Sequence, residues 1–291
     1  MTVWELCESM RSAMDEYGIE ASQLESQELT AKATGADRRD VLRWKSMDVT
    51  ASQRRTAGEM LIQRLRGKPV AYIIGEWDFY GHTFLVTPDV LIPRSDTEVL
   101  CHAALEEIKK RKNPKVMDLC CGSGCIGISI ALEAPNASVT AVDVSVAALG
   151  VARQNAERYK LTKERYNAIW GDAYRLGGVS GRYDVLVCNP PYITAKEMRE
   201  LDGSVRDYEP ELALYGGEDG MDFYRIISRR GITTMRPGGC VLVECGWKQA
   251  REVATLFYSG GLEHIETIPD LNGIDRVVRA YVPKDLEGLK E

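Results

Sequence analysis

The chain has 291 residues, of which 44% are hydrophobic and 27% are charged, and its formal net charge is −6. This composition is typical of a globular protein, and the length suits one large or two modest domains. It excludes a wholly disordered, collagen-like or coiled-coil chain. No apolar run approaches the roughly 18 residues of a membrane helix, and the acidic N-terminus does not resemble a signal peptide.

The first 75 residues are predicted to form a bundle of about four helices. Val3, Leu6 and Met10 recur at helical spacing, and Thr50 can cap a later helix. Charge is unevenly spread: residues 1–34 carry seven acidic and two basic side chains, and residues 35–75 carry nine basic against four acidic ones. The basic segment is either a surface for an acidic partner or an ordinary solvated helical face.

Residues 70–93 are rich in β-favouring side chains, and Gly81-His82 can turn the chain. We interpret residues 76–93 as a β-hairpin linker. Ser95-Asp96-Thr97-Glu98 has the form of a capping box, and it predicts a helix that extends to about Lys112.

From there the sequence alternates between short apolar strands and helices, which predicts a mostly parallel sheet covered on both faces. The last two strands are expected to form a pair. The predicted strands are Val116–Cys120, Val139–Val144, Asn167–Trp170, Tyr183–Cys188, Cys240–Cys245, Ile265–Ile268 and Arg276–Val282.

The eight cysteines and three histidines do not show the spacing of a metal site, and no CxxC pair occurs. Most of the cysteines lie in apolar runs or beside a glycine-rich turn. We therefore expect buried, reduced thiols in a cytoplasmic protein and no bound metal.

The first predicted strand of the alternating region runs directly into a glycine-containing turn, Asp118-Leu119-Cys120-Cys121-Gly122-Ser123-Gly124, and then into a helix. Such a turn lets a ligand approach the backbone, and the helix start offers free N–H groups. Gly122, Gly124 and Gly127 also match the letters of the dinucleotide-binding pattern, so that function remains open at this point.

Carboxylates stand at the ends of the next two strands. Asp143 lies about 20 residues past the glycines, where a carboxylate can accept both hydroxyls of a ribose, although it could instead cap the following helix. Asp172, with Ala173 after it, could bind the amino group of an adenine or simply be a turn residue. Together the three strand ends predict an adenosine site.

The fourth strand ends in Asn189-Pro190-Pro191-Tyr192, the sharpest signal in the chain. The two prolines fix the backbone and remove two N–H donors. The Asn189 side-chain oxygen and the Pro190 carbonyl remain as acceptors, and Tyr192 offers a flat face. This arrangement suits a planar –NH₂ group whose nitrogen must be turned toward an electrophile.

These motifs, in this order, resemble class I S-adenosylmethionine-dependent methyltransferases that modify planar nitrogens. Further stretches along nearly the whole chain resemble the release factor glutamine methyltransferase family. They are Phe79-Tyr80-Gly81, Val90–Glu98, Val205–Pro210, Gly216-Gly217-Glu218-Asp219-Gly220 and Asp270–Arg276.

The resemblance implies an α/β, Rossmann-like fold with a seven-stranded, mostly parallel sheet and an N-terminal helical bundle joined by a β-hairpin. Residues 1–75 would recognise the substrate, residues 76–93 would link, and residues 94–291 would form the methyltransferase domain. The expected product is N5-methylglutamine in the Gly-Gly-Gln motif of peptide chain release factors 1 and 2. A monomer is expected, with no nucleic-acid or membrane partner.

In this interpretation the catalytic residues are Asn189, Pro190, Pro191 and Tyr192. The cofactor-binding residues are Asp118, Cys120, Cys121, Gly122, Ser123, Gly124, Asp143, Asp172, Ala173 and Asn189. The chain departs from the family pattern at Ser95, at Cys120-Cys121 and at Ala173, where the family usually has proline, Gly-Thr and a large apolar residue. The last change puts one adenine contact in doubt.

Four other functions were weighed. A ribosomal-protein glutamine methyltransferase or an adenine-N6 nucleic-acid methyltransferase would share the Asn-Pro-Pro-Tyr motif, but the second would be expected to carry a basic groove. A non-catalytic adenosine-binding module would not need that motif, and a dinucleotide-dependent dehydrogenase would not explain it.

Overall fold

The computed structural model describes residues 1–175 and 182–284, and the chain divides into two compact units. Met1–Glu76 and Asp202–Tyr208 form the first unit, and Trp77–Leu201 and Glu209–Glu291 form the second. Among the described helices, none combines the length and the apolar character that a membrane crossing requires.

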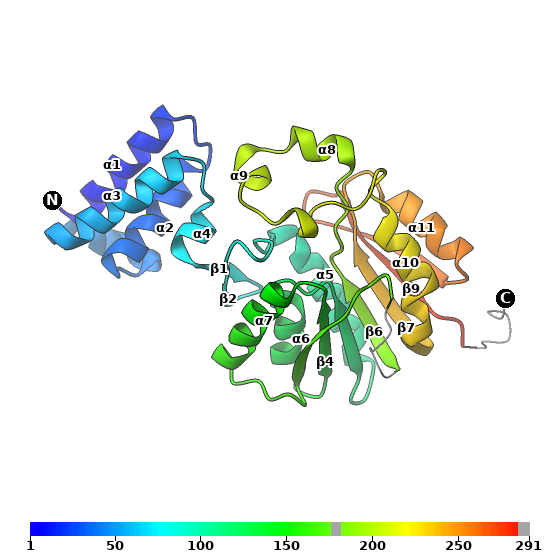
Figure 1. Cartoon of the computed structure of the whole chain (residues 1–291). Helices are drawn as coiled ribbons and strands as arrows, with labels where there is room; N and C mark the ends of the chain where they lie inside the picture. The colour runs from blue at the N-terminus through cyan, green and yellow to red at the C-terminus, as the bar shows by residue number, and fades with distance from the viewer. Residues whose placement is uncertain (176–181, 285–291) are drawn as a thin grey trace. The chain divides into compact units, whose positions relative to one another are not determined.

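The first unit is helical, as predicted, and its core includes Val3, Cys7, Ala36 and Trp44. Thr50 caps its helix through a capping box with Gln53. The helices, which Figure 1 shows in blue and cyan with α9 in yellow-green, are α1 (Val3–Glu16), α2 (Ser22–Thr34), η1 (Arg38–Ser46), α3 (Ala51–Leu65), α4 (Val70–Ile74) and α9 (Gly203–Arg206).

The charge asymmetry of this unit is partly neutralised inside it. Arg64 from the basic segment forms an ion pair with Glu25 of the acidic segment, with 2.5 Å between Nε and Oε2. Arg38 similarly pairs with Glu28. The opposite charges of residues 1–34 and 35–75 therefore meet across the helices, and only part of the basic segment remains free for a partner.

The β-hairpin is shorter than predicted. Its strands are β1 (Glu76–Phe79) and β2 (His82–Leu85), and the turn places Tyr80 and Gly81 at φ of +51° and +76°. Val70–Ile74 forms α4, although its residues favour strands, because the segment packs against other helices of the first unit. Residues 86–93 are not paired as a strand. Val86, Val90 and Ile92 are nevertheless buried, so their apolar character reflects packing.

The second unit contains, within its described residues, a seven-stranded sheet of order β5-β4-β3-β6-β7-β9-β8. Its first five strands are parallel and β9 is antiparallel to both neighbours, which confirms the predicted mostly parallel sheet with a final strand pair. The strands are β3 (Lys115–Leu119), β4 (Ser138–Asp143), β5 (Tyr166–Trp170), β6 (Tyr183–Cys188), β7 (Met235–Glu244), β8 (Glu263–Pro269) and β9 (Asp275–Tyr281).

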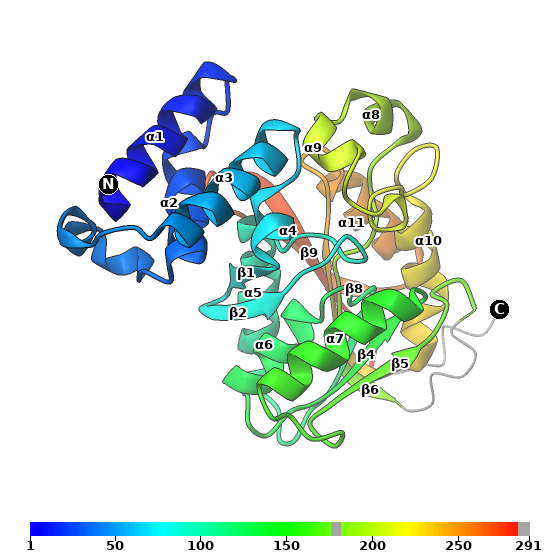
Figure 2. The same cartoon turned by 60° about the vertical axis from the view of Figure 1, so that its left-hand side comes forward.

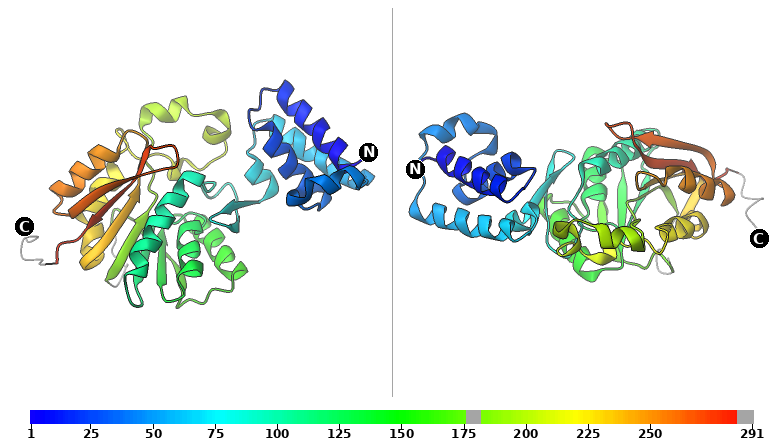
Figure 3. Two further views of the ribbon diagram at one scale, coloured as in Figure 1. Left: turned by 180° about the vertical axis from the view of Figure 1, so that it is seen from behind. Right: turned by 90° about the horizontal axis from the view of Figure 1, so that it is seen from above.

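Helices cover both faces of this sheet. Neighbouring strand residues alternate between the two cores: Val116 faces α5, α6 and α7, whereas Met117 faces α10 and α11. Figure 2 shows α7 along the β4–β5 part of the sheet, and Figure 3 shows α11 beside the β8–β9 pair. The helices are α5 (Glu98–Lys109), α6 (Cys125–Glu133), α7 (Val146–Arg158), α10 (Asp222–Arg229) and α11 (Ala250–Ser259).

The expected capping box at the start of α5 does not form. Ser95–Thr97 forms a short 3₁₀ turn, η2, without a side-chain cap. Glu98 instead accepts a hydrogen bond from the backbone N–H of Tyr80 at 2.8 Å. A carboxylate that could have capped the helix is thus used to hold the hairpin turn.

Candidate active site

The loops after β3 and β6 leave the sheet side by side, because Leu119 and Cys188 are partners in the parallel register. From β3 the chain runs outward through β4 to β5, and it then returns to β6 on the other side of β3. Ligands of open parallel sheets bind at such reversals, where neighbouring loops separate. The loops Cys120–Gly124 and Asn189–Tyr192 therefore meet at one edge of the sheet.

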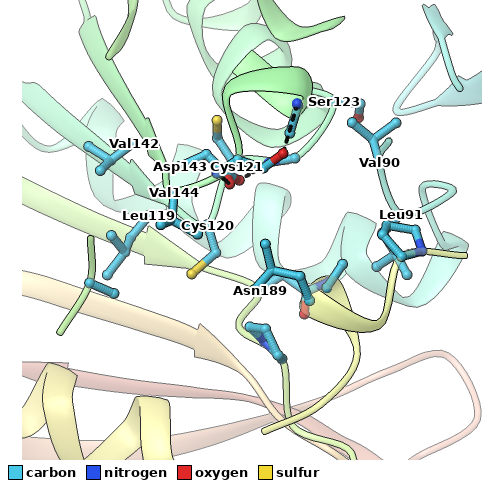
Figure 4. Close-up of a pocket in the computed structure, with 18 of the residues that line it drawn as sticks. Val90, Leu91, Leu119, Cys120, Cys121, Ser123, Val142, Asp143, Val144 and Asn189 are labelled. Carbon is cyan, nitrogen blue, oxygen red and sulfur yellow. Dashed lines mark hydrogen bonds between the residues drawn. The ribbon is translucent and has the colours of Figure 1, made fainter. Parts of the chain in front are cut away.

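A cavity of about 340 Å³ lies at this edge. In Figure 4, Cys120, Cys121 and Asp143 lie on one side, Val90 and Leu91 lie opposite, and Asn189 lies between them. The predicted site residues that line the cavity are Cys120, Cys121, Gly122, Ser123, Asp143, Asp172, Ala173, Asn189 and Pro191.

Four predicted residues lie outside the lining: Asp118, Gly124, Pro190 and Tyr192. Asp118 is fully buried, and its Oδ2 accepts the backbone N–H of Gly127 at 3.0 Å. Gly124 has φ of +80°, and a Cβ there would lie 2.5 Å from the Tyr166 hydroxyl. Both residues thus support the loop from behind and do not face the cavity.

The loop after β3 is held by the carboxylate at the end of β4. Asp143 Oδ2 accepts the Gly122 N–H at 2.9 Å, and Oδ1 accepts the Ser145 N–H at 2.8 Å. Burial raises the pKa of Asp143, although the backbone donors act in the opposite direction. Each oxygen has a second lone pair, so this cavity-lining carboxylate can still accept hydroxyl groups.

The end of β5 combines a carboxylate with an aromatic wall. Asp172 Oδ1 accepts the Tyr174 N–H at 2.8 Å, and Ala173 is buried. Tyr174 packs edge-on against Phe223, with 5.6 Å between the ring centroids, and both rings line the cavity. Phe223 belongs to α10, far along the chain, and no motif marked it. An aromatic surface is therefore present although Ala173 replaces the expected large side chain.

The loop after β6 is fixed by side chains from distant parts of the chain. Asn189 Nδ2 donates to Thr97 Oγ1 at 3.2 Å, and the Tyr192 hydroxyl donates to Glu244 Oε1 at 3.4 Å. The Gln249 amide donates to the Tyr192 carbonyl at 3.0 Å. Sequence patterns did not predict the contact of Thr97 with Asn189 or that of Gln249 with Tyr192, because the residues of each pair lie far apart in the chain.

The glycine-rich turn at residues 216–220 packs directly on this loop. A Cβ on Gly216 would lie 2.6 Å from the Pro191 carbonyl oxygen, and one on Gly220 would lie 2.3 Å from the Tyr192 carbonyl oxygen. Such separations are far too short for a real side chain. The turn is therefore glycine-rich because the backbone of Pro191-Tyr192 approaches it closely.

Other stretches that resemble the family, Val90–Glu98, Val205–Pro210 and Asp270–Arg276, contribute residues around the same loops. Glu209 accepts the Ile92 N–H at 3.2 Å and forms an ion pair with Arg94. Arg276 bridges Asp96 and Asp270, each at 3.0 Å. These charged side chains thus connect the segments around the site through ion pairs and hydrogen bonds to other residues of the protein.

Comparisons with known proteins agree with this architecture. A family model described as the methyltransferase small domain matches residues 97–202, and one described as the PrmC N-terminal domain matches residues 5–75. A crystal structure of a methyltransferase from Pyrococcus furiosus matches with a TM-score of 0.51 at 17% identity, covering 78% of this chain and 99% of that one. The larger unit accordingly has a methyltransferase fold.

Two relatives show which family of methyltransferases the chain resembles. The chain is 37% identical over 280 residues to a release factor glutamine methyltransferase of Geobacter sulfurreducens, and the match covers 95% of both proteins. It is 43% identical over 223 residues to a release factor glutamine methyltransferase of Cereibacter sphaeroides, covering 77% of this chain and 78% of that protein. With the Asn-Pro-Pro-Tyr loop beside the cavity, the chain belongs to the release factor glutamine methyltransferase family.

Proposed function

We propose that this protein transfers a methyl group from S-adenosylmethionine to the N5 atom of the glutamine in the Gly-Gly-Gln motif of peptide chain release factors 1 and 2. The observation that carries the proposal is the acceptor-rich loop Asn189-Pro190 beside a cavity bordered by Asp143 and Asp172. The near full-length similarity to release factor glutamine methyltransferases supports this choice of substrate.

The residues that line the cavity fit the cofactor. Asp143 would accept the ribose hydroxyls, Asp172 would accept the adenine amino group, and Tyr174 and Phe223 would flank the base. The left-handed backbone at Gly122, with φ of +52°, lets a ligand approach the main chain closely. When bound, S-adenosylmethionine supplies an electrophilic methyl group on a sulfonium.

An amide nitrogen is a poor nucleophile because its lone pair is delocalised into the carbonyl. Asn189 Oδ1 and the Pro190 carbonyl would accept the two hydrogens of the substrate –NH₂ and orient the nitrogen toward the methyl group. The same two acceptors would stabilise the positive charge that develops on nitrogen. As the C–N bond forms and the bond between the methyl group and sulfur breaks, the nitrogen would release one proton to water, which leaves neutral N5-methylglutamine. Pro191 and Tyr192 would hold the loop rigid, so that little reorganisation is needed during transfer.

The helical unit at residues 1–75 is proposed to recognise the substrate protein, since a glutamine side chain alone carries little information. Arg54, Arg55 and Arg66 are exposed, and none of them forms an ion pair with a residue in the described ranges. They belong to the part of the basic segment that forms no ion pair within the described residues, and we propose them as the contact surface.

A methyl-transfer assay with labelled S-adenosylmethionine tests the proposed substrate. Purified release factor, the same factor with its Gly-Gly-Gln glutamine changed to alanine, duplex DNA and ribosomes would be offered in parallel. We expect label only on the unaltered release factor, at the Gly-Gly-Gln glutamine in the peptide map. Label on DNA or on a ribosomal protein would overturn the proposed substrate.

Charge reversal tests the recognition surface. The double substitution Arg55→Glu and Arg66→Glu should raise KM for the release factor several-fold while kcat at saturation changes little, because approach and docking are electrostatic. Lys109→Glu with Lys112→Glu is a matched control in the other unit with the same change in net charge. An equal rise of KM in both double variants would contradict the assignment.

A further inference from the structure

The loop after β3 is held from two sides, and the second support comes from α7. On one side the Asp143 carboxylate accepts the Gly122 N–H. On the other side the Ser123 carbonyl accepts a hydrogen bond from Nδ2 of Asn155 at 2.9 Å. Asn155 lies on α7, 32 positions along the chain from Ser123, and it is fully buried. The loop thus depends on a residue that belongs to none of the motifs of the sequence analysis.

The other two hydrogen bonds of the Asn155 amide connect it to the β-hairpin. Its Oδ1 accepts the Leu85 N–H at 2.7 Å, and its Nδ2 donates to the Leu85 carbonyl at 3.0 Å. Leu85 ends β2, so the amide pairs with the end of that strand much as a neighbouring strand would. One side chain thereby joins the hairpin strand, α7 and the loop that lines the cavity, all within the second unit.

The partners of Asn155 fix the orientation of its amide. A main-chain carbonyl can only accept and a main-chain N–H can only donate, so the –NH₂ group must face the two carbonyls and Oδ1 must face the N–H of Leu85. The flipped amide would place its oxygen against two other acceptors. Both amide hydrogens are therefore in use, and no other side chain of this length carries two donor hydrogens beside an acceptor.

We propose that Asn155 is a positioning residue that holds the Ser123 carbonyl, and with it the loop Cys121–Gly124, in the shape that binds S-adenosylmethionine. Asn155 does not itself line the cavity. Ser123 is only 2% exposed, so its carbonyl would be left buried without this partner, and the loop would have to move to regain a hydrogen bond. This inference rests on the proposed function, and it uses only the cofactor of that function.

A neighbouring side chain shows how positioning can be separated from simple anchoring of the hairpin. Tyr159, at the end of α7, donates from its hydroxyl to the Thr83 carbonyl of β2 at 2.8 Å, and its ring packs against Phe84. It therefore attaches the same hairpin strand to the same helix, but it does not line the cavity. Tyr159→Phe removes one anchor of the hairpin and leaves the bond between Asn155 and Ser123 in place.

The test compares Asn155→Leu, which keeps the branched shape but removes all three hydrogen bonds, with the control Tyr159→Phe. Calorimetry well below the melting temperature of each variant should show the dissociation constant of S-adenosylmethionine raised on the order of tenfold in Asn155→Leu and unchanged in Tyr159→Phe. With saturating cofactor and release factor, kcat of Asn155→Leu should return close to that of the wild type. Asn155→Ala, which leaves room for a water molecule, should show a smaller loss of affinity and carries the test if Asn155→Leu does not fold.

Hydrogen exchange without cofactor gives a second readout. The Gly124 N–H donates to the Cys121 carbonyl at 2.8 Å, and it should exchange faster in the Asn155 variants, while the amides of β3 stay as in the wild type. Unchanged cofactor affinity in the Asn155 variants, or an equal loss in Tyr159→Phe, would overturn the positioning role. If the wild type binds no S-adenosylmethionine, the proposed function and this inference fail together. If it binds the cofactor but does not methylate release factors, only the proposed substrate fails.

Discussion

The proposed cofactor side of the cavity, at the ends of β4 and β5, and the proposed reaction side, at the end of β6, are built in different ways. On the cofactor side, Asp143 binds Gly122 and Ser145, and Asp172 binds Tyr174, so each of these bonds joins residues at most 21 positions apart. On the reaction side, Asn189 is held by a residue 92 positions away, and Tyr192 by residues 52 and 57 positions away.

Because the two sides depend on different contacts, cofactor affinity and turnover should respond to different substitutions. The hydrogen bonds of the cofactor side form once β3, β4, β5 and the loops that follow them are in place, because each bond lies within this stretch of the chain. The reaction side needs η2, β7 and α11 to be in place as well. We therefore expect substitutions on the reaction side to change turnover with little effect on cofactor affinity, and those on the cofactor side to do the reverse.

The largest expected effect is the loss of the reaction-side acceptor. Asn189→Ala should reduce kcat by about 10²–10³-fold, the usual consequence of removing one hydrogen bond to a developing charge. Single-turnover methylation of release factor measures it. Near-normal turnover would show that the Asn189 oxygen does not orient the substrate amide.

On the cofactor side, Asp143→Ala should weaken S-adenosylmethionine binding by about 1.5–3 kcal/mol, the scale of hydrogen bonds to a charged group. Titration calorimetry measures this directly. At saturating cofactor the variant should recover most of its kcat, in contrast to Asn189→Ala. If both variants lose turnover equally under saturation, the two sides are not separable.

A substitution that crowds the backbone beside Pro191 should disturb the reaction side and leave the cofactor side unchanged. Gly216→Ala forces a Cβ against the Pro191 carbonyl, and it should lower the free energy of unfolding by about 1–3 kcal/mol while disturbing the Asn189–Tyr192 loop. The matched control is Gly150→Ala in α7, where a Cβ meets nothing within 4 Å. The control should be more stable than the wild type by about 0.5–1 kcal/mol, and urea unfolding compares them.

The smallest effect concerns the carboxylate behind the cofactor loop, and it depends on pH. Burial raises the pKa of Asp118 from 3.8 to about 7, so the free energy of unfolding falls as the pH rises from about 4 to about 7, where the unfolded state loses this proton before the folded state does, and it stays lower above pH 7. Asp118→Asn keeps an acceptor for Gly127 without the charge. It should be more stable than the wild type by about 1–2 kcal/mol at pH 8.

At pH 3.5 the stability advantage of Asp118→Asn should largely vanish, because Asp118 of the wild type is then mostly protonated in both the folded and the unfolded state. Urea unfolding at both pH values measures the difference. A constant advantage at pH 3.5 and pH 8 would contradict the raised pKa and would indicate a packing effect.

Much of this arrangement follows from local sequence. The alternation of apolar strands and helices predicted the parallel sheet, since hydrophobic periodicity is set by the geometry of each element. Strand ends also predicted Asp143, Asp172 and Asn189 at one edge, because parallel strands finish on the same side of a sheet. Nine of the predicted site residues line the cavity for this reason.

Where the predictions were wrong, a non-local contact had replaced a local one. The predicted hairpin extended to residue 93, but its second strand ends at Leu85, and the β-favouring Val86, Val90 and Ile92 are buried outside any strand. Glu98 could cap α5 but binds the Tyr80 backbone instead. In both cases the local preference is worth about 1 kcal/mol or less, and tertiary contacts easily exceed it.

The sequence alone thus specified the fold class and most of the loop residues that meet at the cavity, because each of these depends on residues close together in the chain. It could not specify Phe223 as a wall of the cavity, the close approach of Gly216 to the Pro191 carbonyl, the contact of Thr97 with Asn189, or the contact of Glu244 with Tyr192. These residues come together only when strands and helices far apart in the sequence pack into one domain. No local pattern records that packing.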